Sequence, residues 1–459
     1  MVKTLAIFSF IFSLQAFAIP NMETAKIVPG SSLEAYKYTL KNGLHLIVVP
    51  DTRNPVASLH FMLDAGSNRE KLGTTGLAHF FEHNMFRKTV GAPEGNYDRV
   101  LNSVGGSGNA GTGDAFVTFY SKFPAPAIET MLKLEADRFM HLDITDPYFS
   151  TEKGAVISER KLRVENDPMQ RSQEVLRSIT ERGTPMQWMT IGSKSDVENM
   201  SLNAAKQFYK EFYTPDNTLI VLGGPFKPQQ AFELVEKYFS SWRSGRTPKQ
   251  EPYPANYYVR DLGKSFICSA PVFTKRYQIV YPSAQSDLTT LVYTSLFEAM
   301  LNDNIEGTFS RRLVKAKLAT EFNFYQVYWQ DQTHPYIANF YLGREQDFEK
   351  VKAFWLKNVA TVLNTPVTNK IKNQVLKQMA VSNADATERM TSLVNVAIDN
   401  DFFLRDFHAA GKAEDILKNL NEKKFKEWMK KNLNEKNFYM TGIVPTGATT
   451  PCSEYKEPL

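Results

Sequence analysis

The sequence has 459 residues, of which 42% are apolar and 22% are charged, values typical of globular proteins. A chain of this length is too long for one ordinary hydrophobic core and predicts two or more domains. The formal net charge is only +5, and the lysines and arginines are spread out rather than clustered. This distribution excludes the basic footprint expected of a nucleic-acid-binding protein.

The first 18 residues have the pattern of a secretory signal peptide. Lys3 supplies the positive start, residues 5–14 form an apolar core, and Ala16-Phe17-Ala18 fits a cleavage site. The apolar run is too short for a comfortable membrane span, and no later run of about 20 apolar residues follows. We therefore expect an exported protein, periplasmic or secreted, whose mature chain has no membrane span.

Strands and helices alternate along the first half of the mature chain. Residues 19–32 look like a loose lead-in, and Asn42-Gly43 is a hairpin signal between two strands. The segment 102–113 is rich in glycine. The other predicted strands are 56–63, 115–120 and 217–223, and the predicted helices are 127–141, 150–164, 203–212 and 228–242.

The most informative motif follows the strand at 56–63. His79-x-x-Glu82-His83 lies in an apolar-periodic run that predicts a helix, with Thr74 or Thr75 capping its start. Positions i, i+3 and i+4 share one helix face, so two imidazoles and one carboxylate point the same way. Zinc binds histidine readily, and an adjacent carboxylate can take a proton from water that zinc activates. A structural histidine pair is the alternative.

A catalytic zinc site needs a third protein ligand, which should come from another helix. Glu159, in the predicted helix at 150–164, is the best candidate. Glu152 lies two turns earlier on the same face and could accept a hydrogen bond from a metal-bound histidine. A solvated helix face explains both glutamates equally well on these grounds alone.

A similar order of elements returns after residues 243–254, which read as a linker. The predicted strand at 437–444, with a helix at 424–432 before it, echoes the strand at 217–223. This repetition predicts an α+β protein of two homologous domains, each a mostly antiparallel sheet packed with helices. Cys268 and Cys452 can pair or remain two thiols. The expected segments are a signal peptide 1–18, a lead-in 19–32, a catalytic zinc-binding domain 33–243, a linker 244–259, a homologous non-catalytic domain 260–445 and a tail 446–459.

At this point the chain resembles the inverted-motif zinc metallopeptidases, the family of pitrilysin, insulysin and the mitochondrial processing peptidase. The resemblance covers nearly the whole mature chain and is densest up to residue 243. Besides His79, Glu82, His83 and Glu159, the matching motifs are 40–48, 65–67, 105–112, 118–120, 134–138 and 208–217.

The resemblance implies an exported zinc metalloendopeptidase with one Zn²⁺ per chain, held by His79, His83 and Glu159. Glu82 would be the general base that activates the water, and the substrate would be a peptide or an unfolded protein segment. Asn109 and Ala110 would lie on an edge strand, where an extended peptide can pair by backbone hydrogen bonds.

One segment of the second half departs from the family. Relatives usually carry an Arg and a Tyr there that help to hold the substrate, where this chain has Val314 and Thr320. Nearby substitutes are Arg311, Arg312, Tyr325 and Tyr328, although ordinary structural roles are favoured. The chain is therefore expected to act as the metal-bearing subunit of a heterodimer with a metal-free homologous subunit, or as a homodimer. A non-catalytic peptide-binding or structural subunit of a larger complex is the alternative.

Overall fold

The computed structural model describes residues 22–243, 245, 247–248, 261–281, 287–326 and 335–454. The predicted signal peptide and nearly all of the predicted linker lie outside the described residues, as does Tyr328. Among the helices that the structure describes, none is both long and apolar enough to cross a membrane.

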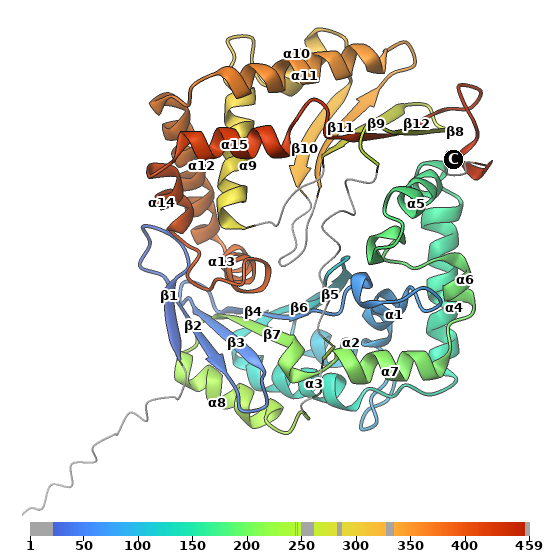
Figure 1. The fold of residues 1–459 in the computed structure, drawn as a ribbon. Coiled ribbons are helices and arrows are strands. Elements are labelled where there is room, and N and C mark those ends of the chain that lie inside the picture. Colours follow the sequence, from blue (N-terminus) through green and yellow to red (C-terminus); the bar gives the residue numbers. More distant parts are fainter. Residues whose placement is uncertain are drawn as a thin grey trace, which may run out of the picture.

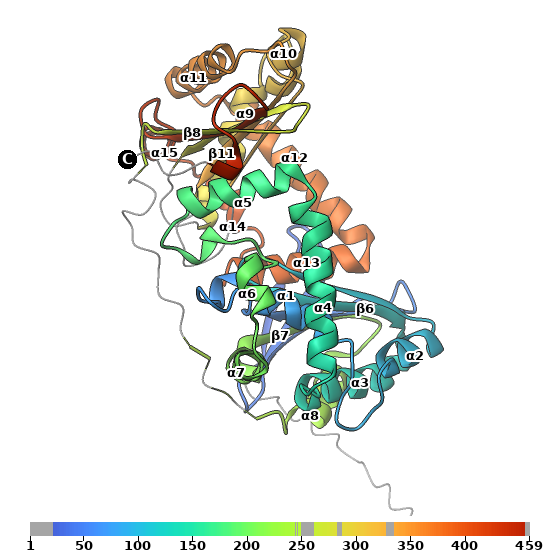
Figure 2. The same ribbon diagram turned by 90° about the vertical axis from the view of Figure 1, so that its right-hand side faces the viewer.

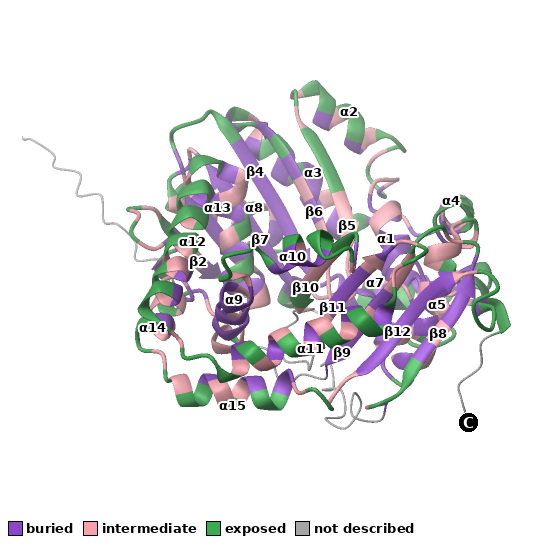
Figure 3. Ribbon diagram, turned by 90° about the horizontal axis from the view of Figure 1, so that it is seen from above, coloured by how far each residue is buried: buried purple, intermediate pink, exposed green. Residues whose placement is uncertain are grey.

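The first half of the chain builds a seven-stranded sheet in the order β1-β2-β3-β7-β4-β6-β5. β3 and β7 run parallel, and the other neighbours are antiparallel. Figure 3 shows that the central strands β4 and β7 are buried along most of their length, whereas β5 lies at the edge. The strands are β1 (Glu23–Lys26), β2 (Glu34–Thr39), β3 (His45–Pro50), β4 (Val56–Leu63), β5 (Ser107–Thr112), β6 (Val117–Pro124) and β7 (Thr218–Gly224).

Eight helices accompany this sheet within the described part of the chain. They are α1 (Leu77–Asn84), α2 (Asn96–Ser103), α3 (Ile128–His141), α4 (Tyr148–Arg160), α5 (Pro168–Thr180), α6 (Lys194–Glu198), α7 (Leu202–Phe212) and α8 (Pro228–Phe239). Alternate residues of β4, Leu59 and Phe61, enter a core with α3 and α8, while Met62 faces the opposite side of the sheet. A π-helical turn, Lys161–Glu165, continues α4.

The second half builds a five-stranded sheet in the order β10-β11-β9-β12-β8. Trp355 is fully buried at the centre of the core beneath it. The strands are β8 (Ser265–Ala270), β9 (Lys275–Tyr281), β10 (Glu321–Gln326), β11 (Tyr336–Leu342) and β12 (Tyr439–Pro445). The helices are α9 (Leu288–Asn302), α10 (Phe309–Lys315), α11 (Phe348–Asn364), α12 (Asn369–Glu388), α13 (Met390–Ile398), α14 (Lys412–Lys418) and α15 (Glu422–Asn432).

The two sheets repeat one topology. In each of them a parallel pair, β3 with β7 or β8 with β12, is followed by three strands that all pair antiparallel. Thus β7 corresponds to β12, and the edge strand β5 corresponds to β10. The repetition agrees with the echo between the predicted strands at 217–223 and 437–444. The domain boundaries drawn from it stay a prediction.

One helix of each half packs on the sheet of the other half. α13 packs on β3, β4 and β7, where Leu393 and Val394 join an apolar cluster with Ile47. In return, α5 packs on β8 and β12, where Leu176 joins a cluster with Phe266. Figures 1 and 2 show α5 beside the second sheet and α13 beside the first. The halves therefore share their hydrophobic cores.

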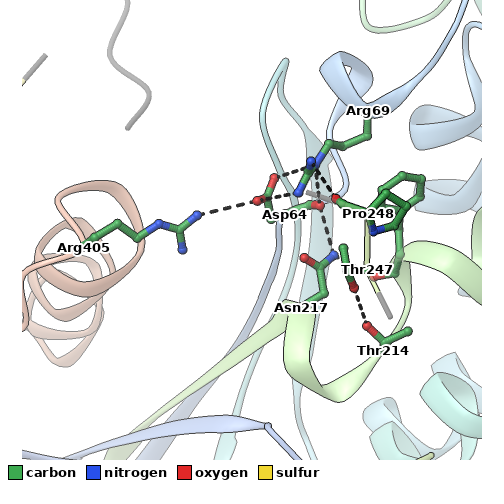
Figure 4. A network of polar contacts seen from close by, with 8 residues as sticks. Asp64, Arg69, Thr214, Asn217, Thr247, Pro248 and Arg405 are labelled. Carbon is green, nitrogen blue, oxygen red and sulfur yellow. Dashed lines mark hydrogen bonds and ion pairs between the residues drawn. The ribbon is translucent and has the colours of Figure 1, made fainter. Parts of the chain in front are cut away.

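A polar network adds to this contact (Figure 4). The Asp64 carboxylate, just after β4, accepts a hydrogen bond from Arg69 at 2.8 Å and lies 3.6 Å from Arg405 of the second half. Asn217 donates to the Asp64 carbonyl at 3.0 Å, and Arg69 donates to the Pro248 carbonyl at 3.2 Å. The network thus joins β4, β7, the chain after α8 and the second half at one point.

The structure corrects one expectation about the sequence, settles another and adds a strand. The expected loose lead-in contains β1, which pairs with β2 because Ala25 and Ile27 have apolar partners to bury against. Cys268 and Cys452, for which the sequence left pairing open, form a disulfide that ties the tail to β8. The glycine-rich segment 102–113 includes β5, which its composition did not predict by periodicity.

Candidate metal centre

α1, the helix that carries the motif, begins at a glycine with a left-handed backbone. Gly76 is the N-cap with φ of 94°, and it provides no side-chain cap. The Glu70 carboxylate fills this role by accepting hydrogen bonds from the N–H groups of Gly76 at 2.9 Å and Ala78 at 2.8 Å. The predicted cap by Thr74 or Thr75 is wrong, because the Thr75 hydroxyl donates to a carboxylate of α6.

Gly192 determines how closely the start of α1 approaches the chain before α6. Its φ is 84°, and a Cβ atom at this position would lie 2.6 Å from the backbone of Gly76. Next to it, the Ser193 N–H donates to Thr75 Oγ1 at 2.9 Å. The two backbone segments can touch in this way only because both contacting residues are glycines.

One face of α1 packs into the core, and the other carries the two histidines. Phe80 and Phe81 are fully buried, and their rings contact Phe149 of α4 and Phe208 of α7. These contacts fix the rotation of the helix, and they leave His79 and His83, one turn apart, facing Glu159 of α4. The structure therefore brings together the three predicted ligands from two separate helices.

The distances between these three groups suit a small tetrahedral ion. His83 Nε2 lies 3.1 Å from Glu159 Oε2, and His79 Nε2 lies 3.6 Å from the same oxygen. One ligand atom from each residue lies within 4.8 Å of the others. Ligands about 2.0–2.1 Å from zinc at tetrahedral angles are about 3.3 Å apart, so the donor set fits Zn²⁺. An open fourth position would remain for a water or a substrate oxygen.

Charged neighbours hold two of the glutamates. Glu159 Oε1 forms an ion pair with Arg163 at 2.7 Å, and Oε2 is turned toward the histidines. Glu152 is almost fully buried, receives Arg87 at 2.6 Å, and lies 3.7 Å from His83 Nδ1. The last distance is too long for a hydrogen bond, so Glu152 acts on His83 through its charge. That Glu152 accepts a hydrogen bond from a metal-bound histidine stays a prediction.

The two histidines have different electrostatic surroundings. Burial lowers the pKa of His79, whose Nδ1 has no hydrogen-bond partner among the described residues. The carboxylate of Glu152 raises the pKa of His83 against the effect of burial. Burial alone would raise the pKa of Glu152, but His83 and the charge of Arg87 lower it overall. His79 is thus the histidine that more readily stays neutral, the form a metal requires.

Glu82 is held from the edge strand. Thr112 Oγ1, at the end of β5, donates a hydrogen bond to Glu82 Oε2 at 2.6 Å. Asn109 and Ala110 lie on the same strand, and no other described strand pairs with its outer side. The Ala110 N–H donates to the Asn109 side chain at 2.9 Å instead of to a partner strand. A free strand edge therefore runs directly to the carboxylate of Glu82.

The family segment of the second half does not reach this centre by any contact that the structure describes. Arg312 is buried and donates to Asn358 at 2.7 Å and to the Leu301 carbonyl at 2.8 Å, which is a structural role. Val314 is exposed on α10. Tyr325, on β10, lines a cavity between the two halves.

Sequence reasoning missed the groups that position the candidate ligands. Thr112, Arg87, Arg163 and Glu70 contact Glu82, Glu152, Glu159 and the start of α1. The Arg163 contact could have been found, since Arg163 follows Glu159 by four helical positions. The contacts of Thr112 and Arg87 join distant parts of the chain, and Glu70 lies six residues before the N-cap residue that it contacts.

Residues 46–194 match the family description "Insulinase (Peptidase family M16)", and residues 199–379 match "Peptidase M16 inactive domain". A Helicobacter pylori protein named zinc protease PqqE is 29% identical over 223 residues, which are 47% of this chain and 50% of that protein. A probable mitochondrial-processing peptidase subunit beta of Arabidopsis thaliana is 25% identical over 217 residues, 47% of this chain and 41% of that protein.

Among solved structures, a crystal structure of a protease from Helicobacter pylori is similar with a TM-score of 0.80 and 20% identity. The match covers 90% of this chain and 99% of that one. At this identity the likeness shows a common fold. The matched part of this chain spans half or less of the length of the zinc protease PqqE and of the Arabidopsis thaliana subunit.

Proposed function

The chain belongs to peptidase family M16, and on that premise we propose that it is an exported zinc metalloendopeptidase acting on peptides or unfolded protein segments. The observation that carries the proposal is the convergence of His79, His83 and Glu159, with Glu82 beside them at the end of a free strand edge. A relative named as a zinc protease supports the choice of metal.

In this proposal His79, His83 and Glu159 hold one Zn²⁺, and Glu82 is the general base. The ion would polarise the scissile carbonyl and make water more acidic. Glu82 accepts the proton of the attacking water and later donates it to the leaving amine. The hydrogen bond from Thr112 to Oε2 of Glu82 orients the carboxylate that takes that proton.

The substrate in this proposal pairs with β5. Its outer edge, at Asn109 and Ala110, offers backbone groups to an extended peptide, which would then lie along the line leading to Glu82. Backbone pairing requires an unfolded segment and depends little on the identity of its side chains. The peptide must displace the Asn109 side chain from the Ala110 N–H.

We further propose that the active form contains two chains. Val314 and Thr320 stand where the resemblance calls for an Arg and a Tyr, and a relative is named as a beta subunit of a larger enzyme. A metal-free homologous subunit would supply the missing pair; a homodimer is the second arrangement. Light scattering on the chain alone, and mixed with a candidate partner, separates the two.

Two variants test the catalytic assignment. Glu82→Gln should keep stoichiometric zinc in metal analysis but lose hydrolysis of a quenched peptide, because an amide cannot accept the proton. Glu159→Gln should lower zinc occupancy. Full activity of Glu82→Gln, with or without a partner chain, would refute the proposed role.

The second candidate is a non-catalytic peptide-binding or structural subunit. The match of residues 199–379 to a domain described as inactive favours it in part. This candidate predicts that the chain binds peptides but hydrolyses none, alone or with any homologous partner, and that a chelator changes nothing. Chelator-sensitive cleavage by the purified protein would exclude it.

A further inference from the structure

A cavity of about 230 Å³ lies between the two halves. Asp114 and Arg177 line it from the first half, and β9, β10 and β12 line it from the second. Asp114 lies in the turn between β5 and β6, two residues after Thr112. A peptide that pairs with β5 and passes Glu82 therefore meets this cavity a few residues farther on.

Most charges around the cavity have partners. Arg177 donates to the Asp114 carboxylate at 2.8 Å. Glu181 accepts a hydrogen bond from Tyr439 at 3.3 Å. Arg276 of β9 is different: its Nε donates to Asn339 at 2.9 Å, and no carboxylate of the described residues forms an ion pair with it.

The strand register keeps Glu181 away from Arg276. Tyr439, which contacts Glu181, pairs with Val280, whereas Arg276 pairs with Ile443 at the other end of the same strands. Four residues of a strand span about 13 Å. The half-buried guanidinium of Arg276 thus contributes a positive charge to its end of the cavity, and no carboxylate in the described part of the chain forms an ion pair with it.

The surroundings of Arg276 hold its side chain in place. The guanidinium lies 5.7 Å from the ring centre of Tyr341. Gln278 and Tyr325 line the cavity beside it, and Gln278 accepts a hydrogen bond from Thr441 at 3.0 Å. An ordered guanidinium is suited to bind a carboxylate through two hydrogen bonds.

We propose that Arg276 binds a carboxylate of the peptide substrate, a few residues beyond the scissile bond on the Thr112 side. The carboxylate is that of an acidic side chain or of the substrate's own C-terminus. The inference rests on the proposed function for its direction along β5. It gives the enzyme a charge preference that backbone pairing on the edge strand cannot provide.

The test measures binding, so that it does not depend on turnover. Fluorescent peptides are titrated by anisotropy into the Glu82→Gln protein, in pairs that differ only by Glu or Gln at successive positions. A second pair differs by a free or an amidated C-terminus. We expect one carboxylate position to bind about tenfold more tightly than its neutral partner, and the Glu82→Gln/Arg276→Gln protein to lose this difference.

Two further variants control the result. Arg276→Lys should restore part of the preference, and Arg171→Gln, which removes an exposed charge on α5, should leave it unchanged. Equal affinities for all charged and neutral pairs, or a preference that survives Arg276→Gln, would overturn the proposal. If the preference is present but the wild-type protein cleaves nothing, alone or with a homologous partner chain, the proposed peptidase function fails and the binding site stands.

Discussion

The hydrogen bond between Thr112 and Glu82 connects the edge strand to the proposed general base. Replacing Thr112 with Val removes the hydroxyl but keeps the shape of the side chain. A hydrogen bond to a carboxylate contributes about 1.5–3 kcal/mol. If the bond holds Glu82 in place during proton transfer, its loss lowers kcat/KM by about 10- to 150-fold. Zinc content should not change, since Thr112 contacts no predicted ligand of the metal.

The assay is hydrolysis of a quenched peptide by the zinc-loaded protein, with metal analysis of the same samples. Thr112→Ser should recover most of the activity because it restores the hydroxyl. Thr118→Val, on the neighbouring strand of the same hairpin, serves as the matched control and should retain normal kcat/KM. Wild-type kcat/KM in Thr112→Val, or a loss that simply follows lost zinc, would refute the positioning argument.

Three other changes probe the structure around the site. Gly192→Ala should destabilise the fold by more than about 1 kcal/mol in urea unfolding and lower zinc occupancy, because its Cβ would lie 2.6 Å from the Gly76 backbone. Glu135→Gln should cost about 3–5 kcal/mol because it leaves buried Arg138 without its carboxylate, and adding Arg138→Met should recover much of the loss. Burial lowers the pKa of His60 from 6.5 to about 4, so the unfolded chain binds the proton first as pH falls. About 3 kcal/mol of stability should disappear between pH 6.5 and pH 4, and His60→Phe should remove this part of the acid sensitivity in denaturation at several pH values.

Two of the candidate metal ligands could be found from the sequence because they follow a short helical spacing. His79 and His83 lie one turn apart, and the family resemblance added Glu159 from a helix well downstream. The structure brings these side chains together. Their catalytic and metal-binding roles remain predictions until zinc and activity are measured.

Apart from the ion pair between Arg163 and Glu159, the contacts that position the candidate ligands could not be found in the same way. Glu70 caps α1 from outside the helix, and Gly192 contacts Gly76 across more than a hundred residues of chain. A local capping rule selects Thr74 or Thr75 because it examines only adjacent residues. The glycines of β5 weaken any periodic pattern, so only the family resemblance predicted an edge strand at Asn109 and Ala110. The pairing of β5 with β6 confirms that strand.

The exchange of α5 and α13 has a consequence for how the molecule can be divided. Each fragment alone would expose the apolar surface that the other fragment covers, so the halves should be insoluble when produced separately and should complement each other when refolded together. A single proteolytic cut between residues 243 and 261 should leave a nicked protein whose fragments co-purify. Reducing agent should not release them, because Cys268 and Cys452 both lie in the second fragment. The two halves repeat one topology, but we expect them to be stable only as a pair.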